Sequence, residues 1–197
     1  MEELKKYAKE NMIPIVRDKT ADKLVEICIS IKPKHILEIG TAIGYSGILM
    51  LTSTDALLTT IEKNEERAEQ ALSNFKRFNL LDRVNLKLGD ALDEIEKLYN
   101  SMQKYDLIFL DGPKGQYFRY YPFLKEMLRY EGVIFADNVD LLGLLSSPQL
   151  VTHKKRAMVN NMKKFIEIVQ SDVDMETKFY HIDDGFCIIK KIKNKSV

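Results

Sequence analysis

The chain has 197 residues, of which 45% are hydrophobic and 30% charged, and its formal net charge is +1. These proportions are those of a soluble globular protein, and a chain of this length buries a sufficient core without a metal or disulfide to hold it. They exclude a strongly basic or acidic protein, and no uninterrupted apolar run is long enough for a membrane helix.

The amino terminus and the cysteines indicate the cellular compartment. The first ten residues, MEELKKYAKE, are charged and lack the apolar core of a secretory signal. Cys28 and Cys187 lie far apart within apolar runs and show no CxxC spacing, so we expect both to be buried and reduced. The sequence therefore predicts a cytoplasmic protein.

The first half of the chain alternates helix-like and strand-like segments. Helical spacing after Thr20, a candidate N-cap, predicts a helix that ends near Ile31. Asn64 is expected to open another helix, with acidic residues in its first turn and basic residues in its last, as the helix dipole prefers. Short apolar runs predict strands at 35–39, 56–61 and 84–88.

The second half continues this alternation and then departs from it. Further strands are predicted at 105–110 and 133–136, and further helices at 91–99, 117–130 and 153–169. Two last strands, 178–182 and 186–192, are separated by Asp183-Asp184-Gly185, which is typical of a hairpin turn. The predicted fold is an α/β Rossmann-like sheet, mostly parallel with an antiparallel C-terminal hairpin, in a single domain over residues 1–197.

Glycines and acidic residues stand at the ends of three consecutive predicted strands. Gly40 and Gly44 follow the first strand, where they permit close approach of the backbone to a ligand, and their spacing is not the GxGxxG of dinucleotide binders. Glu62 ends the second strand, where a carboxylate can accept ribose hydroxyls, and Asp90 ends the third. Any α/β protein has such turns singly, but three in succession favour a nucleoside-containing cofactor.

Asp111, Asp137 and Asn138 follow the next two strands and offer only oxygen ligands. Without Cys or His nearby, this set selects Mg²⁺, Mn²⁺ or Ca²⁺ over zinc. Open coordination positions could hold two adjacent oxygens of a substrate, lowering the pKa of a hydroxyl and aiming it. The alternative is that an Asp-Asn pair after a strand simply forms a turn.

The segments LEIGTAIGYS, TIEKN, GDALD, FLDGPKGQY and ADNV, in this order, resemble the metal-dependent O-methyltransferases of the catechol and caffeoyl-CoA type. The resemblance runs from about Tyr7 to the C-terminal hairpin. The stretch YAKENMIPI and the loop from DNV into a basic helix are most similar to bacterial enzymes that methylate 5-hydroxyuridine at the tRNA wobble position. The family implies a seven-stranded sheet whose last strand is antiparallel, and a homodimer.

The resemblance also implies roles for individual residues. It assigns the metal to Asp111, Asp137 and Asn138, with Asp111 and Lys114 as catalytic residues and Lys114 as general base. A lysine at its ordinary pKa of about 10.4 is a poor base, so Lys114 could equally be a solvated loop residue or an electrostatic anchor. S-adenosylmethionine is expected to contact Glu38, Gly40, Ser46, Glu62, Asp90 and Asp111.

Two features depart from the family pattern. The chain starts almost directly at YAKENMIPI, about one helix later than family members usually do, and Gly112-Pro113 replaces small residues after the first metal ligand. Tyr45 and Tyr117 stand beside the motifs and are expected to serve as packing residues.

A basic stretch after the metal motif favours an RNA acceptor. No acidic residue occurs from Leu141 to Ile166, and helical spacing places Met158, Met162, Phe165 and Val169 on one face. A phosphate backbone would gain from the basic residues, which a fold alone would not. Small catechol-like diphenols remain the alternative acceptor, and a noncatalytic or dehydrogenase-like domain is disfavoured by the missing GxGxxG. The cations of this predicted tRNA surface are Lys154, Lys155, Arg156, Lys163 and Lys164.

Overall fold

The computed structural model describes residues 1–140 and 152–192. Its elements follow one another in the alternating order that the sequence predicts. In chain order they are α1 (Glu2–Glu10), α2 (Asp18–Ile31), β1 (His35–Ile39), α3 (Tyr45–Thr52), β2 (Leu57–Glu62), α4 (Glu65–Arg77), η1 (Leu81–Arg83), β3 (Val84–Leu88), α5 (Ala91–Asn100), β4 (Tyr105–Leu110), η2 (Lys114–Gln116), α6 (Tyr117–Met127), β5 (Leu128–Asp137), η4 (His153–Lys155), α7 (Arg156–Ser171), β6 (Met175–Tyr180) and β7 (Phe186–Lys191).

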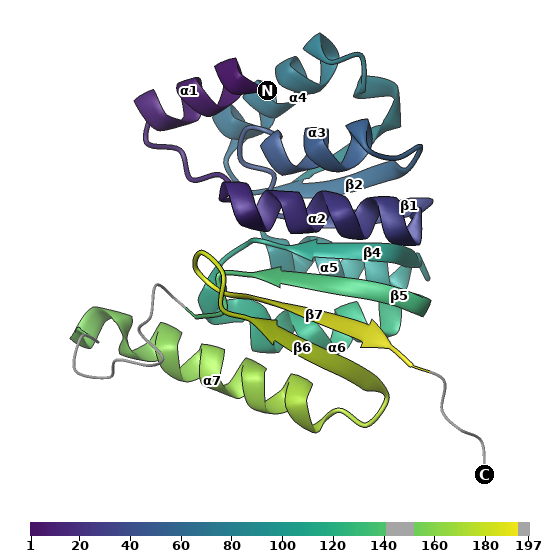
Figure 1. The fold of residues 1–197 in the computed structure, drawn as a ribbon, viewed down its shortest axis with the longest axis vertical. Coiled ribbons are helices and arrows are strands. Elements are labelled where there is room, and N and C mark those ends of the chain that lie inside the picture. Colours follow the sequence, from purple (N-terminus) through teal and green to yellow (C-terminus); the bar gives the residue numbers. More distant parts are fainter. Residues whose placement is uncertain (141–151, 193–197) are drawn as a thin grey trace.

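The strands form one seven-stranded sheet in the order β3-β2-β1-β4-β5-β7-β6 (Figure 1). Strands β1 to β5 pair in parallel, whereas β7 runs antiparallel to both β5 and β6. The predicted Rossmann-like sheet with an antiparallel C-terminal hairpin is therefore confirmed. Because the sheet is parallel from β1 to β5, the carboxyl ends of these strands all meet at one edge.

Helices cover both faces of the sheet, and the sheet divides the hydrophobic core into two halves. Helices α1 to α4 pack on one face against side chains such as Ile36 and Phe109, and α5 to α7 pack on the other against Leu37 and Ile108. Adjacent strand residues thus point into opposite halves of the core. The sequences of the central strands are continuous apolar runs because both faces of these strands are buried.

Several predicted boundaries shift in the structure. Thr20 is not an N-cap: α2 begins at Asp18, and the Thr20 amide and hydroxyl both donate to Asp183 Oδ2, at 3.0 and 3.1 Å. The N-cap prediction at Asn64 is confirmed, since its side chain accepts from the Arg67 amide at 2.8 Å.

The helix predicted at 117–130 ends at Met127, where β5 begins. Leu128 is buried and pairs with Tyr105 of β4. Residues 128–130 therefore belong to the sheet, although their local sequence favours a helix. The first strand of the hairpin likewise begins at Met175 rather than at residue 178, because β6 pairs with β7 from Met175 onward.

Both cysteines are buried and unpaired, as predicted. Burial raises the pKa of the Cys28 thiol to about 12 and that of Cys187 further, so neither is a ready nucleophile. Within residues 1–140 and 152–192, no helix has the length and apolarity to cross a bilayer.

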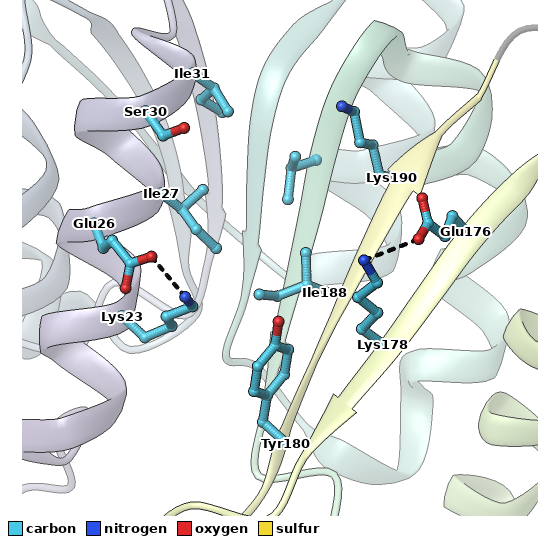
Figure 2. Close-up of a pocket in the computed structure, with 11 residues that line it drawn as sticks. Lys23, Glu26, Ile27, Ser30, Ile31, Glu176, Lys178, Tyr180, Ile188 and Lys190 are labelled. Atoms are coloured by element: carbon cyan, nitrogen blue, oxygen red, sulfur yellow. Dashed lines mark hydrogen bonds and ion pairs between the residues drawn. The ribbon is translucent and has the colours of Figure 1, made fainter.

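A groove of about 220 Å³ lies between α2 and the hairpin strands, and we call it the side groove (Figure 2). Apolar side chains, among them Ile27 and Ile188, line it. Charged residues around it form pairs between near neighbours: Lys23 with Glu26 at 2.7 Å and Lys178 with Glu176 at 3.0 Å. The full lining is Lys23, Glu26, Ile27, Ser30, Ile31, Val133, Glu176, Lys178, Tyr180, Ile188 and Lys190.

Candidate active site

A cavity of about 720 Å³ opens at the carboxyl edge of the parallel strands, and we call it the carboxyl-edge cavity. Residues at the ends of β1 to β5 line it in succession, as expected where parallel strands end together. These strand-end residues are Gly40, Glu62, Gly89, Asp90, Asp111, Gly112, Asp137 and Asn138.

The cavity gathers most of the predicted site residues but not all of them. Gly40, Glu62 and Asp90 line it near the ends of β1 to β3, and the three predicted metal ligands and Lys114 line it near β4 and β5. Glu38 and Ser46 are buried and do not line it. Direct contact of these two with a cofactor stays a prediction, because the structure places them behind the cavity wall.

Glu38 holds that wall through a chain of hydroxyl groups. Ser46 Oγ donates to Glu38 Oε1 at 2.5 Å and Thr60 Oγ1 donates to Oε2 at 2.6 Å. Thr41 and Thr60 hydroxyls lie 2.6 Å apart, and since Thr60 gives its proton to Glu38, Thr41 must be the donor to Thr60. Burial raises the pKa of Glu38 to about 7, against the lowering effect of the hydroxyl bonds.

Gly40 is required by a close approach between two strand ends. Its φ is +99°, and a Cβ there would lie 2.5 Å from the Asp111 carbonyl oxygen. The Asp111 amide also donates to the Ile39 carbonyl at 3.0 Å. The glycine therefore seats Asp111 against β1, a role beyond the ligand approach that the sequence suggested.

Glu62 uses much of its hydrogen-bonding capacity on the backbone. Oε2 accepts from the Ala42 amide at 2.9 Å, and Oε1 accepts from the amides of Lys63 and Asn64, each at 2.9 Å. A carboxylate has about four acceptor positions, so three are already engaged. Glu62 thus fixes the loop after β1 and the start of α4, and a ligand hydroxyl would share this carboxylate with them.

Asp90 is both a cavity residue and the N-cap of α5. Its Oδ1 accepts from the Leu92 amide at 3.0 Å, and Lys63 Nζ lies 3.0 Å from Oδ2. The Lys63 hydrogen bond and the backbone hydrogen bond lower the pKa of Asp90, so it stays ionised at the cavity edge.

The predicted metal ligands bring two carboxylates together where little water reaches. Asp137 is 2% exposed, and burial followed by the negative charge of Asp111 raises its pKa to about 7. A bound cation would relieve this repulsion, and the oxygen-only donor set fits a hard divalent ion. In the described ranges no three His, Cys, Asp or Glu side chains form a metal cluster; the candidate set has two carboxylates and one carboxamide.

Tyr117 joins the two ligand-bearing strands, a role that sequence reasoning missed. It is fully buried, and its hydroxyl lies 2.9 Å from the Leu110 carbonyl and 3.2 Å from the Asp137 carbonyl. Lys114 Nζ hydrogen-bonds to Asp111 and lies 3.1 Å from the same hydroxyl. The start of α6 therefore positions Asp111, Asp137 and Lys114 together. Helical spacing could not show this, since Tyr117 also packs as a core residue.

The predicted basic surface is divided by the structure. Lys155 lines the cavity, whereas Lys163 and Lys164 are exposed farther along α7, with Lys164 Nζ 5.6 Å from the Phe118 ring centroid. The helix predicted at 153–169 begins at Arg156, because residues 153–155 form η4, so Lys155 precedes the helix. Met158 lines the cavity. Val159 takes the buried position that was predicted for Met158. The Lys154 side chain and residues 141–151 lie outside the described residues.

The hairpin turn connects the loop after β5 to the start of α2. The Val139 amide donates to the Gly185 carbonyl at 2.9 Å, and Arg17 Nε lies 2.8 Å from Asp184 Oδ2. A Cβ on Gly185, whose φ is +70°, would lie 2.7 Å from Asp140 Cβ. Arg17 and Asp184 both line the cavity, and nothing in the sequence pattern pairs them.

The arrangement of cavity, strand-end acids and antiparallel hairpin matches one protein family. The family model described as O-methyltransferase matches residues 1–192. This chain belongs to the O-methyltransferase family.

This O-methyltransferase is similar in sequence and in fold to individual members of the family. A Staphylococcus aureus structure assigned as a caffeoyl-CoA O-methyltransferase has a TM-score of 0.89 and 32% identity, covering 96% of this chain and 91% of that one. A Bacillus cereus O-methyltransferase solved with SAH has a TM-score of 0.87 and 26% identity, covering 96% and 89%. A catechol O-methyltransferase of Niastella koreensis is 33% identical over 119 residues, 59% of this chain and 52% of its own length. The chain thus aligns with about half of that relative.

Proposed function

We propose that this O-methyltransferase takes its methyl group from S-adenosylmethionine. The proposal is supported by Gly40, Glu62 and Asp90 at consecutive strand ends of the carboxyl-edge cavity and by the SAH complex of the Bacillus cereus relative. Glu62 would share its carboxylate with a ribose hydroxyl. Calorimetric titration of the protein with S-adenosylmethionine tests this proposal, and an absence of binding would overturn it.

The second part of the proposal is a hard divalent ion held by Asp111, Asp137 and Asn138. The observation that carries it is the buried carboxylate of Asp137 near a second carboxylate, Asp111. Burial and Asp111 raise the pKa of Asp137 despite the opposing charge of Lys114, and a bound cation would relieve this repulsion. Such an ion would bind two adjacent acceptor oxygens and lower the pKa of the one to be methylated. When bound, S-adenosylmethionine would supply the sulfonium methyl group that the acceptor oxygen takes, with S-adenosylhomocysteine as the leaving group.

Lys114 is the proposed partner of the acceptor hydroxyl. Its Nζ is held between Asp111 and the Tyr117 hydroxyl, so it is positioned beside the proposed metal ligands. In its uncharged form it would take the proton that the hydroxyl loses, and in its charged form it would stabilise the resulting oxyanion. A pH–rate profile of Lys114→Arg distinguishes these roles, because arginine keeps the charge but cannot act as a base.

We propose 5-hydroxyuridine of tRNA as the acceptor. Its O4 and 5-hydroxyl are adjacent oxygens, and Lys155 at the cavity with Arg156, Lys163 and Lys164 along α7 supports an acceptor that carries phosphates. The first turn of α7 has no acidic residue to complement its dipole, so these cations do not serve the helix. A small catechol shares the adjacent oxygens, and the Niastella koreensis relative supports that second candidate.

One assay compares the two acceptors. Labelled S-adenosylmethionine is offered with undermodified tRNA or with catechol, each with and without Mg²⁺ and with EDTA. Transfer to tRNA that requires Mg²⁺ is the expected result. Transfer to catechol alone would establish the second candidate, and full turnover after chelation would overturn the metal.

A surface variant sharpens the assay. Joint change of Lys154, Lys155 and Arg156 to Ala should abolish tRNA methylation and leave transfer to catechol. A control that changes Lys9, Lys76 and Arg77 to Ala removes the same charge from exposed positions that do not line the cavity. Equal tRNA methylation by both triple variants would remove this basic surface from the mechanism.

A further inference from the structure

The cationic side chains that line the carboxyl-edge cavity differ in whether they form ion pairs with acidic residues. Lys63 is paired with Asp90, and Lys114 with Asp111. Arg67 lies in the first turn of α4, which follows β2, so it borders the other end of the cavity from β4 and β5. Over the described ranges, Lys155 has no ion pair and is exposed. Among the described residues, the ion pair of Arg17 runs through Nε, which lies 2.8 Å from Asp184 Oδ2.

The Arg17–Asp184 pair orients a guanidinium at the cavity. The Arg17 side chain is 55% exposed whereas that of Asp184 is 15% exposed, so the carboxylate is the fixed member. Asp184 is itself held against the loop after β5, because its carbonyl accepts from the Asp140 amide at 3.1 Å. A guanidinium has five N–H donors, and a contact through Nε leaves the four on its terminal nitrogens for a ligand. Planar donor pairs of this kind suit the oxygens of phosphate.

Arg17 and Lys155 approach the proposed metal ligands from opposite faces of the sheet. Arg17 immediately precedes α2, which packs on the face covered by α1 to α4. Lys155 immediately precedes α7, which packs on the other face and contacts η2 through the 3.0 Å bond from Asn161 to the Gly115 carbonyl. An acceptor seated on β4 and β5 would therefore have a cation on each side.

The charge of this end of the cavity favours an anionic acceptor once a metal is bound. Three acids, Asp111, Asp137 and Asp184, face three cations, Arg17, Lys114 and Lys155. A divalent ion adds two positive charges to this balance. The surplus would be matched by the phosphates on either side of a nucleotide in RNA.

We propose that Arg17 and Lys155 form a two-sided phosphate subsite that holds the backbone of the acceptor nucleotide across the carboxyl-edge cavity. This subsite rests on the proposed function, because it presumes that the acceptor oxygens are held at the proposed metal ligands. It adds Arg17, which lies about 140 residues before the basic stretch, to the recognition of the acceptor, and it makes Asp184 the residue that positions Arg17.

Calorimetry tests the subsite without methyl transfer. The full-length protein, loaded with S-adenosylhomocysteine and Mg²⁺, is titrated with uridine and with uridine 3′,5′-bisphosphate. The wild-type protein should bind the bisphosphate at least about tenfold more tightly than uridine. Arg17→Ala and Lys155→Ala should each reduce this ratio, and the double variant should bring it close to one. Arg17→Lys should be intermediate, because it keeps the charge and loses the planar fork.

Arg77→Ala is the matched control. Arg77 is an exposed arginine in a single ion pair with Glu3 and does not line the cavity. Its loss should leave the ratio unchanged. If Arg17→Ala unfolds on thermal melting, Arg17→Lys and Lys155→Ala still carry the test.

The outcomes separate this subsite from the proposed function. A wild-type ratio near one, or a ratio that persists in the double variant, overturns the subsite. If the ratios behave as expected but no tRNA is methylated while catechol is, the proposed acceptor is wrong and the phosphate subsite stands. If tRNA is methylated equally by wild type and double variant, the subsite does not serve the reaction.

Discussion

The carboxyl-edge cavity and the side groove differ in how they use charge. In the side groove, Lys23 and Lys178 pair with Glu26 and Glu176 on their own elements, over a lining of aliphatic side chains. In the cavity, acids from the ends of four strands, β2 to β5, converge, and Asp137 is buried with its pKa raised to about 7. The groove leaves its pairs close to water, whereas the cavity buries the Asp137 carboxylate near a second carboxylate, Asp111.

The backbone conformation also differs between the side groove and the carboxyl-edge cavity. The groove is lined by one regular helix and regular strands. The cavity contains Gly40, Ala42 and Asn138 with positive φ values of 99°, 46° and 55°. Strained backbone and buried like charges persist only where surrounding structure enforces them, and they concentrate at functional sites. The contrast indicates that the cavity, and not the groove, is built for chemistry.

The largest effect is expected at Asp137. Asp137→Ala removes a proposed metal ligand, so methyl transfer should fall by at least about a hundredfold. Affinity for S-adenosylmethionine, measured by calorimetry, should barely change, because the metal meets the acceptor. Glu176→Ala in the side groove is the control and should retain wild-type turnover. Comparable losses in both variants would contradict the distinction between the two regions.

Glu62→Gln should weaken S-adenosylmethionine binding by about ten- to a hundredfold, the loss of a charge-assisted hydrogen bond. Gln is preferred to Ala because its carboxamide oxygen can still accept from the Lys63 and Asn64 amides, whereas Ala would lose all three backbone bonds of Glu62. Calorimetry measures the affinity, and Glu26→Gln in the side groove is the matched change. Unaltered binding by Glu62→Gln would remove this residue from the cofactor site.

Glu38 should make the metal-free protein less stable as the pH rises. Its pKa is about 7 in the folded state against 4.5 unfolded, so the folded state binds the proton more tightly. Its contribution is complete below pH 4.5 and is lost as pH rises through about 7, with a size on the order of 1–3 kcal/mol. Urea unfolding at pH 5 and pH 8 should show a smaller loss for Glu38→Gln than for wild type. Identical losses would show that Glu38 does not titrate in this range.

The smallest effect is expected in the side groove. Lys178→Ala breaks an exposed ion pair with Glu176 and should leave the urea midpoint of unfolding almost unchanged, because exposed ion pairs contribute little to stability. Methyl transfer should be unaltered at equal protein concentration. A loss of turnover in this variant would give the groove a part in catalysis.

Much of the fold follows from patterns local in sequence. Apolar runs of five or six residues alternate with helical spacing, and this alone predicts a parallel sheet with helices on both faces. Asn64 as N-cap was predictable, because capping depends on adjacent residues. Thr20 was not, since its hydroxyl is taken by Asp183 on the distant hairpin.

The sequence by itself also determined which strand ends carry acids and glycines, because in a parallel sheet strand order along the chain predicts a shared edge. Only the tertiary structure decided which of those side chains face the cavity. Glu38 accepts hydrogen bonds from Ser46 and Thr60 inside the wall. Tyr117 joins β4 to β5, and Arg17 pairs with Asp184, which is distant in the sequence. Periodicity predicts which face of one helix or strand is buried. Contacts between elements depend on how the whole sheet brings those elements together.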